Sequence, residues 1–231
     1  MLAGCTTTVD GIAARRDPVS AVRDLAAILP SSAEAGQAAG NPLPDSELPE
    51  IGGIDILPNG IRDNADASPI ECLGPVTPFM RVVYEGGDVR RVAWQEFSNF
   101  GGGQTVSSAD VGVVEFGSDA EAQRMFGAFA TRWKACEGKT VRSVLRSPGN
   151  TELYQKITDV KVDGSVLSAT VTNSDNHGDE SFPTERAIGL AADCVVDVDM
   201  AVTGGTPAQQ RVSGRAVSLA AAMQHKVNQG R

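Results

Sequence analysis

The clearest periodic pattern in the chain predicts an amphipathic helix between residues 118 and 138. Ser118 and Glu121 have the spacing of a capping box, and Gly138 is suited to end the helix. Apolar side chains then recur three or four residues apart, at Ala122, Met125, Phe126, Phe129, Ala130, Trp133 and Cys136. This spacing places them on one face, so we expect the helix to supply much of the core, with Cys136 on its buried side.

Several other segments carry the patterns of β-strands. Residues 79–84, 89–97 and 111–116 are rich in apolar side chains, and a Gly-Gly turn separates the first two. The runs 157–162 and 165–172 flank an Asp-Gly pair, which predicts a β-hairpin.

The segment 187–202 alternates most regularly. The period of two places Val196, Val198 and Met200 on one side and Asp197 and Asp199 on the other. We expect the apolar side to face the core. The two aspartates are then predicted to point outward, as an exposed strand face rather than as a pair of catalytic acids.

Shorter helices are predicted toward the ends of the chain. Residues 19–29 have a helical apolar spacing, a second helix is expected from Ser31 or Ser32 to Ala39, and a last one over about 209–228. Residues 41–80 are crowded with proline and glycine. They are interpreted as an ordered but irregular segment.

Composition and charge narrow the function classes. The chain has 231 residues, enough for one large domain or one domain with appendages, and it is 41% hydrophobic and 21% charged, as globular proteins are. The formal net charge of -9 argues against a nucleic-acid partner and against electrostatic docking on anionic lipid. No apolar run approaches the roughly 18 residues of a transmembrane helix.

The first residues predict a lipid anchor. Leu2-Ala3-Gly4-Cys5 has the form of a bacterial lipobox, in which small side chains precede the cysteine that receives the lipid. Residues 1–5 are therefore interpreted as a lipobox remnant with Cys5 as the lipidation site, and residues 6–18 as a flexible tether. A signal peptide needs a charged segment and an apolar core. Because only four residues precede Cys5, we expect the signal peptide to be missing from this sequence.

Three cysteines remain for the exported domain: Cys72, Cys136 and Cys194. At most one disulfide can form among them, and the sequence leaves three pairings open. The odd cysteine would be buried as a small hydrophobe or would pair with another molecule. No two of the three have the spacing of a CxxC metal or redox motif.

No group of residues carries a specific catalytic or cofactor signal. His177 and His225 are the only histidines, and His225 is expected on the surface of the last helix. The run 175–180 is rich in oxygen ligands but lacks the spacing of a calcium loop, so it is interpreted as a solvated loop. The glycine run 101–103 lacks the lysine and hydroxyl residue of a P-loop. We therefore predict no catalytic residue, no metal site and no cofactor.

Four short sequences give the chain a family resemblance. They are Glu71-Cys72-Leu73-Gly74, the lead-in 116–120, Trp133-Lys134-Ala135-Cys136-Glu137-Gly138, and the segment 191–198 around Cys194. With these, the chain resembles the PknH-like extracellular domain over about residues 20–228. That family comprises the sensor domain of a mycobacterial receptor-type Ser/Thr kinase and related domains of mycobacterial lipoproteins. The Trp-x-x-Cys-x-Gly helix end is the most specific of the four.

The resemblance implies a fold and a disulfide pattern. We expect residues 19–231 to form a single α+β domain, with a twisted, mainly antiparallel sheet, helices packed on it, and a cleft. The family has two disulfides, and its pattern would pair Cys72 with Cys136. Cys194 matches half of the second bridge, but no cysteine occurs between 137 and 193. The resemblance therefore implies a free thiol at Cys194.

The sequence and the resemblance leave three possible functions open. The first is a non-enzymatic lipoprotein, anchored to the outer face of the cell membrane, whose cleft binds a small molecule or a cell-wall or lipid fragment. The second is a module that docks on another envelope protein, which predicts an exposed apolar patch. The third and weakest is a hydrolase that uses His177 with nearby acids. No kinase motif occurs, so signalling would act through a partner.

Overall fold

One open antiparallel sheet of nine strands organises the computed structural model, which describes residues 23–145, 151–178, 181–203 and 213–230. Its strands are β1 (Glu50–Gly52), β2 (Ala67–Ser68), β3 (Val89–Ser98), β4 (Ser108–Phe116), β5 (Thr140–Val144), β6 (Glu152–Asp163), β7 (Val166–Asp175), β8 (Phe182–Ala191) and β9 (Cys194–Ala201). Their order across the sheet is β1-β3-β4-β9-β8-β7-β6-β5-β2. The single α+β domain expected from the resemblance is confirmed.

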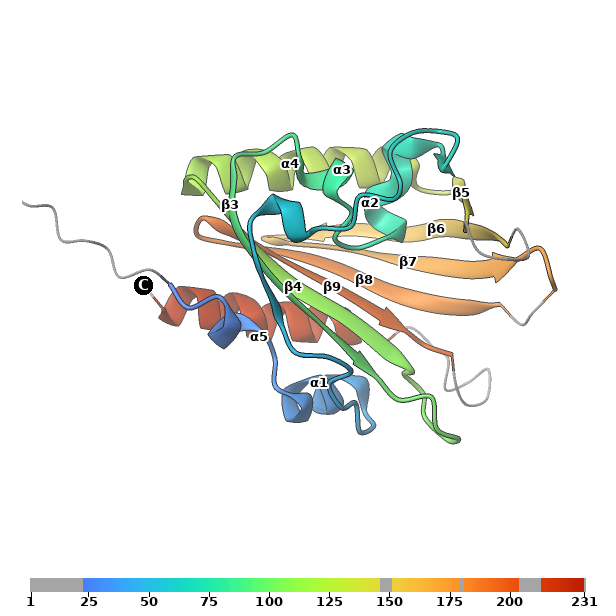
Figure 1. The fold of residues 1–231 in the computed structure, drawn as a ribbon, viewed down its shortest axis with the longest axis horizontal. Coiled ribbons are helices and arrows are strands. Elements are labelled where there is room, and N and C mark those ends of the chain that lie inside the picture. The colour runs from blue at the N-terminus through green and yellow to red at the C-terminus, as the bar shows by residue number, and fades with distance from the viewer. Residues whose placement is uncertain (1–22, 146–150, 179–180, 204–212, 231) are drawn as a thin grey trace, which may run out of the picture.

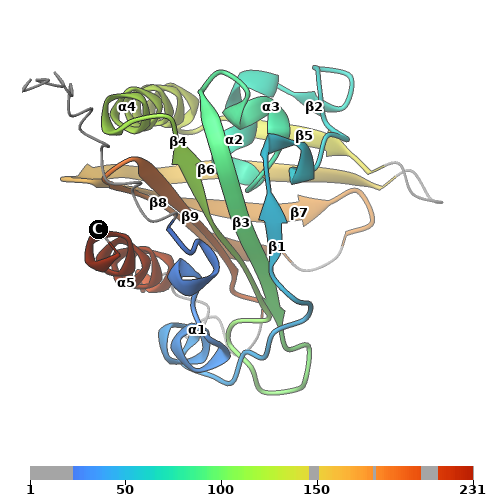
Figure 2. The same ribbon diagram turned by 60° about the vertical axis from the view of Figure 1, so that its left-hand side comes forward.

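Helical elements cover both faces of this sheet (Figure 1, Figure 2). One face carries α4 (Asp119–Cys136) together with the short elements η2 (Ile54–Ile56), η3 (Ile70–Cys72), α2 (Leu73–Val76) and α3 (Arg81–Tyr84). The other face carries η1 (Ala26–Ile28), α1 (Ser32–Ala39) and α5 (Arg215–Gln229). Among the described residues, no helix is both long and apolar enough to cross a membrane.

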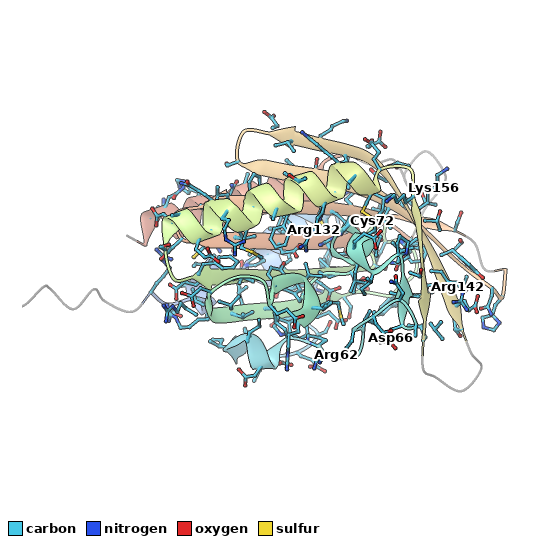
Figure 3. The ribbon with its side chains drawn as sticks, turned by 90° about the horizontal axis from the view of Figure 1, so that it is seen from above. Arg62, Asp66, Cys72, Arg132, Arg142 and Lys156 are labelled. Carbon is cyan, nitrogen blue, oxygen red and sulfur yellow. A yellow bond between two sulfur atoms is a disulfide. The ribbon has the colours of Figure 1, made fainter. Side chains whose placement is uncertain are left out.

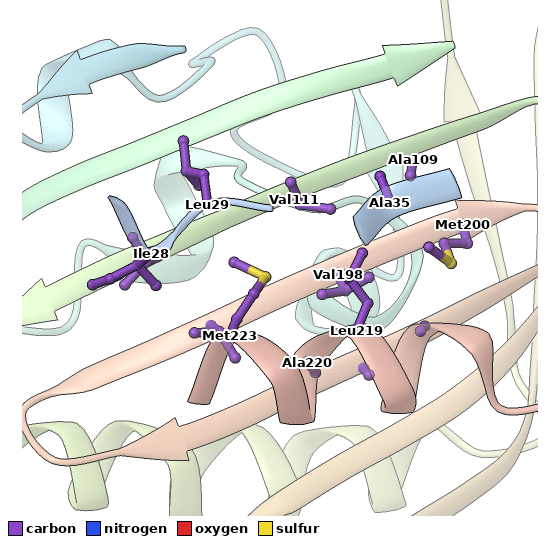
Figure 4. Close-up of a cluster of buried hydrophobic side chains, with 14 of the residues drawn as sticks. Ile28, Leu29, Ala35, Ala109, Val111, Val198, Met200, Leu219, Ala220 and Met223 are labelled. Carbon is purple, nitrogen blue, oxygen red and sulfur yellow. The ribbon is translucent and has the colours of Figure 1, made fainter. Parts of the chain in front are cut away.

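Each face of the sheet therefore has its own hydrophobic core. Figure 4 shows the core under α1 and α5, to which Met223 of α5, Val198 of β9 and Ile28 of the N-terminal segment contribute side chains. The second core joins α4 to the opposite face of the same strands, with Phe129, Trp133 and Val195 among its members. Because apolar layers lie on both sides, every residue of β9 is buried.

This two-sided burial corrects the prediction for Asp197 and Asp199. Both were expected to face solvent, but only 2% of Asp197 and 8% of Asp199 is exposed. Strict alternation signals a strand with one wet face. Here α4, α2 and α3 cover the side where the aspartates point. Both faces of β9 are therefore buried, and the alternation separates an apolar buried face from a charged buried face.

Helix α4 has the predicted N-cap and apolar face, but the predicted contact of the Glu121 carboxylate with Ser118 is not formed. Its N-cap Ser118 accepts a hydrogen bond from the Glu121 backbone N–H, as expected. The Glu121 carboxylate does not reach back to Ser118. It accepts from the Asp88 backbone N–H at 3.0 Å and pairs with Arg124 at 2.6 Å instead. A full capping box is found at Ser31 and Glu34, at the start of α1.

Two other predicted elements differ from the structure. Residues 79–84 were expected as a strand, but Arg81–Tyr84 form the helical turn α3, which buries Tyr84 under α4. Of the helix expected over residues 19–29, the described part forms only the turn η1, and Leu25 and Leu29 still bury their side chains there. Cys5 and the tether 6–18 lie outside the described residues.

The structure joins Cys72 and Cys136 in a disulfide, the pairing that the resemblance implied. The bond links the end of α4 to the irregular segment that crosses the sheet. It closes a loop between residues 64 positions apart, which in the chain-entropy treatment contributes about 4 kcal/mol to stability. Cys194 is free and buried.

Candidate functional site

A buried arginine lies at the centre of the most unusual group of side chains in the domain. Arg186 extends from β8 toward α4, and only 1% of it is exposed. Its Nη1 atom lies 2.8 Å from Asp197 Oδ1, a charge contact that lacks hydrogen-bond alignment, and donates to the Val198 carbonyl at 2.9 Å. Burying a charge is costly unless it is paired and hydrogen-bonded, and Arg186 meets both conditions.

The same guanidinium fastens the irregular segment to the sheet. Arg186 Nε donates to the Pro75 carbonyl and Nη2 to the Gly74 carbonyl, both at 3.2 Å. Above it lies the ring of Trp133 from α4, with its centroid 5.5 Å from Cζ, which adds a cation–π contact. Arg186 therefore binds the sheet, the 74–75 peptide and α4 together.

Tyr84 completes the pairing of Asp197. Its hydroxyl donates to Asp197 Oδ2 at 2.5 Å, and its ring meets Phe129 edge-on at 5.5 Å. Burial, and then the neighbouring Asp197 charge, raises the pKa of Tyr84 well above its ordinary value. For Arg186, burial is the largest influence and lowers the pKa. The charges of Asp197 and Asp199 outweigh it, so the pKa is raised overall.

Beyond Arg186, three carboxylates continue across the sheet on the same face. In the strand register, Glu96 of β3 pairs with Asp110 of β4, Asp110 with Asp199 of β9, and Asp199 with Arg186. We call Glu96, Asp110 and Asp199 the acidic row. Directly opposite residues have Cβ atoms about 5 Å apart, and like charges there destabilise a sheet.

The acidic row makes no hydrogen bonds through its side chains within the described part of the protein. The nearest opposite charge is Arg186, whose Nε lies 3.6 Å from Asp199 Oδ2, beyond hydrogen-bond range. Trp94, two residues before Glu96 and diagonal to Asp110, also has a buried indole N–H without a partner. Buried polar groups are nearly always hydrogen-bonded, so the Trp94 indole N–H calls for an acceptor. The carboxylate oxygens of the row are not fully buried and stay within reach of solvent.

Burial and neighbouring charges raise the pKa of two carboxyls of the row, Asp110 and Asp199. Burial, then the charge of Glu96, raises the pKa of Asp110 to about 6, against the opposing effect of Arg186. Burial also raises the pKa of Asp199 to about 8, with Arg186 lowering it and Asp110 raising it. Glu96 and Asp110 remain partly exposed, so solvent reaches the row from their side. A positively charged group bound there would favour the ionised carboxylates.

The spacing of the row suits a polyatomic cation better than one metal ion. In the described residues, the set of possible ligand atoms that lie within 4.8 Å of one another is Glu115, Asp193 and Cys194, and the acidic row is not among them. At that other set Arg23 already supplies the cation: its Nη1 is 2.6 Å from Asp193 and 2.9 Å from Cys194 Sγ. Burial raises the pKa of the Cys194 thiol to about 12, so the thiol is neutral.

The histidines lie away from these groups. His177 is in an exposed loop after β7, where its Nε2 faces the Thr151 hydroxyl at 3.2 Å. Its backbone N–H donates to Asp175, which makes a local turn. Residues 179 and 180 of the same run lie outside the described residues. His225 is exposed on α5 and contacts Gln229, as expected of a surface residue.

Sequence reasoning did not single out Arg186, Asp110 or Glu96. The available signal was a charged residue directly before an apolar strand run, as in Arg186-Ala187-Ile188. Such a residue is buried only if something covers its face. The covering segment, residues 74–84, comes from the part of the chain with no periodic pattern.

The chain is an α+β domain with one disulfide. One face of its sheet carries the buried Arg186 and the acidic row, and solvent reaches this face beside Glu96 and Asp110. The chain belongs to the PknH-like extracellular domain family, whose profile matches residues 20–226. It is similar to the crystal structure of the extracellular domain of PknH from Mycobacterium tuberculosis, with 23% identity, 89% of this chain and 95% of that chain covered, and a TM-score of 0.74. No curated protein matches the chain.

Membership of this family makes the chain an extracellular domain, which places it on the extracytoplasmic side of the membrane.

Proposed function

We propose that this chain is a non-enzymatic, lipid-anchored domain of the cell envelope that binds a ligand bearing a positively charged group. The observation that carries this proposal is the acidic row: three neighbouring carboxylates whose side chains make no hydrogen bonds in the described part of the protein. A protonated amine or guanidinium has several N–H donors. It would satisfy the carboxylates and offset their repulsion.

The lipid anchor is proposed from Cys5. The Leu-Ala-Gly-Cys sequence and the tether 6–18 support attachment of the lipid to the Cys5 thiol. A full-length gene product with its natural leader is expected to incorporate a fatty-acid label, and Cys5→Ala to abolish it. Labelling that persists in Cys5→Ala would contradict the anchor without affecting the ligand proposal.

The protein-docking alternative predicted a continuous apolar patch. Among the described residues, the exposed large apolar side chains are Leu48, Ile51, Phe100, Leu145 and Val162. They come from four separate segments. Only Leu48 and Ile51 lie together, in and just before the edge strand β1, so the acidic row is the stronger basis for a function.

The test uses the two tryptophans, because Trp94 lies beside the acidic row and Trp133 lies on α4. In protein labelled with ¹⁵N-tryptophan, the two indole N–H signals are assigned with Trp94→Phe. We then titrate putrescine, a diamine, and 1,4-butanediol, its neutral analogue. Putrescine is expected to move the Trp94 signal saturably, and butanediol to leave it in place.

Matched variants localise the effect. Asp110→Asn removes one charge of the row and is expected to weaken putrescine binding about tenfold or more, as for a lost charged partner. Asp163→Asn removes the same charge from the exposed end of β6 and should not weaken it. Equal shifts with putrescine and butanediol, or equal affinity in both variants, would refute the cationic ligand.

A further inference from the structure

A second site lies on α4, separate from the acidic row. A pocket of about 230 Å³ opens between α4 and the short elements η3, α2 and α3. Its walls are mainly apolar, with Ile70, Pro75, Val82, Val83 and Phe129 contributing side chains. In Figure 3, the view from above, Arg132 of α4 and Cys72 of the facing segment are labelled near it. The Cys72–Cys136 disulfide holds these two walls together.

The one strongly buried polar group at this pocket is the indole of Trp133. Only 1% of Trp133 is exposed, and its Nε1 atom is buried without a hydrogen-bond partner in the described part of the protein. A Cβ placed on Gly74 would lie 3.4 Å from Nε1 and 3.3 Å from Val83 Cγ1. Because Gly74 and Val83 both line the pocket, the indole nitrogen lies at its wall.

The volume sets the size of an occupant. An apolar cavity of about 150 Å³ holds a benzene molecule, so 230 Å³ accommodates a small ring or a short chain with one polar substituent. Because buried donors are nearly always hydrogen-bonded, the Trp133 indole N–H favours a ligand that carries a hydrogen-bond acceptor. Glu71 and Arg132, which are both exposed, lie at the rim and leave the interior uncharged.

We propose that this pocket binds a small apolar group that carries a hydrogen-bond acceptor, and that the Trp133 indole N–H donates to that acceptor. The apolar part fills the space between α4 and the 70–83 segment. The missing side chain at Gly74 leaves the room beside Nε1 that the acceptor needs. This site and its ligand chemistry are independent of the cationic ligand proposed above.

The same two indole signals test it, with the full 231-residue chain produced in an oxidising compartment. Acetophenone supplies a ring with a carbonyl acceptor, and ethylbenzene is its counterpart without the acceptor. Methyl hexanoate presents the acceptor on a linear chain and distinguishes a lipid-like source from a ring. Acetophenone or the ester is expected to move the Trp133 proton downfield with a dissociation constant on the order of 1 mM, as for a fragment.

The acceptor and the location each have a control. Ethylbenzene is expected to bind about tenfold more weakly and without the downfield shift, because it accepts no hydrogen bond. Gly74→Ala fills the space beside Nε1 and should abolish the shift. Gly127→Ala, on the exposed side of α4 with no atom within 4 Å of the new methyl, should leave it intact.

Three results would overturn the proposal: a Trp133 signal that neither carbonyl probe moves, equal affinity for acetophenone and ethylbenzene, or unchanged binding in Gly74→Ala. An unchanged Trp94 signal in that variant shows that the fold is retained. Because putrescine is read at Trp94 and acetophenone at Trp133, failure of one proposal leaves the other standing.

Discussion

The raised pKa of Asp110 makes its replacement by asparagine a direct test of the acidic row. Asp110 is a part-buried aspartate directly opposite Glu96, and its side chain makes no hydrogen bond in the described structure. Asparagine keeps the shape of the side chain and removes the titration. We expect Asp110→Asn to be more stable than the parent protein at neutral pH.

The magnitude follows from the pKa. In the folded protein the pKa of Asp110 is raised from 3.8 to about 6, so between these values the folded state holds a proton that the unfolded state has lost. The associated stability is fully present below pH 3.8 and is lost as pH rises through about 6. The complete shift corresponds to about 3 kcal/mol. The stabilisation by asparagine should therefore grow by about 2 kcal/mol between about pH 4.5 and about pH 7.5.

Urea unfolding followed by tryptophan fluorescence at these two pH values measures the difference. Asp163→Asn is the control, because Asp163 is an exposed residue at the end of β6, directly before the hairpin turn. If Asp110→Asn is less stable than the parent near neutral pH, or if its effect is the same at both pH values, burial and the Glu96 charge do not raise the pKa of Asp110 as described here.

Three further predictions concern the scaffold. Arg186→Leu should lower the free energy of unfolding by about 3–5 kcal/mol, because Asp197 loses its charge partner inside the core; chemical denaturation near neutral pH measures this. Replacing Cys72 and Cys136 together by serine should lower it by about 4 kcal/mol, and peptide mapping that instead links Cys136 to Cys194 would contradict the assigned bridge. Ser118→Ala should cost about 1 kcal/mol through the lost cap of α4, against no comparable loss in the exposed Ser46→Ala.

The sequence predicted the parts of the fold that have local causes. The apolar stripe of α4 and the hairpin between β6 and β7 both depend on nearby residues, and both are found. The turn of the hairpin lies one residue later than the Asp-Gly pair predicted, at Gly164 and Ser165, because Asp163 still pairs with Val166. The irregular segment 41–80 could not be placed, because its position depends on distant contacts. Gln155 of β6 donates to the Val76 carbonyl, and Arg186 of β8 donates to Gly74 and Pro75.

The same dependence explains the error at Asp197 and Asp199. Their spacing in β9 correctly predicted that both aspartates lie on the same face of the strand. It carried no information about the segment that covers this face. The covering segment 74–84 is fixed by Arg186, and Arg186 is tolerated in the interior only because Asp197 pairs with it. The covering segment and the buried Arg186–Asp197 pair depend on each other. Because they come from distant parts of the chain, no local sequence pattern could predict their arrangement.

Arg186 also determines whether a change at one proposed site affects the other. It lies between them: its guanidinium contacts Asp197 and approaches Asp199 on the sheet, and it supports the Trp133 ring and the Gly74 carbonyl on the side of the pocket. A change at Asp110 should therefore alter the Trp94 signal and leave Trp133 in place. A change at Arg186 removes the support of both sites at once, so it should move both signals even where each ligand alone moves only one.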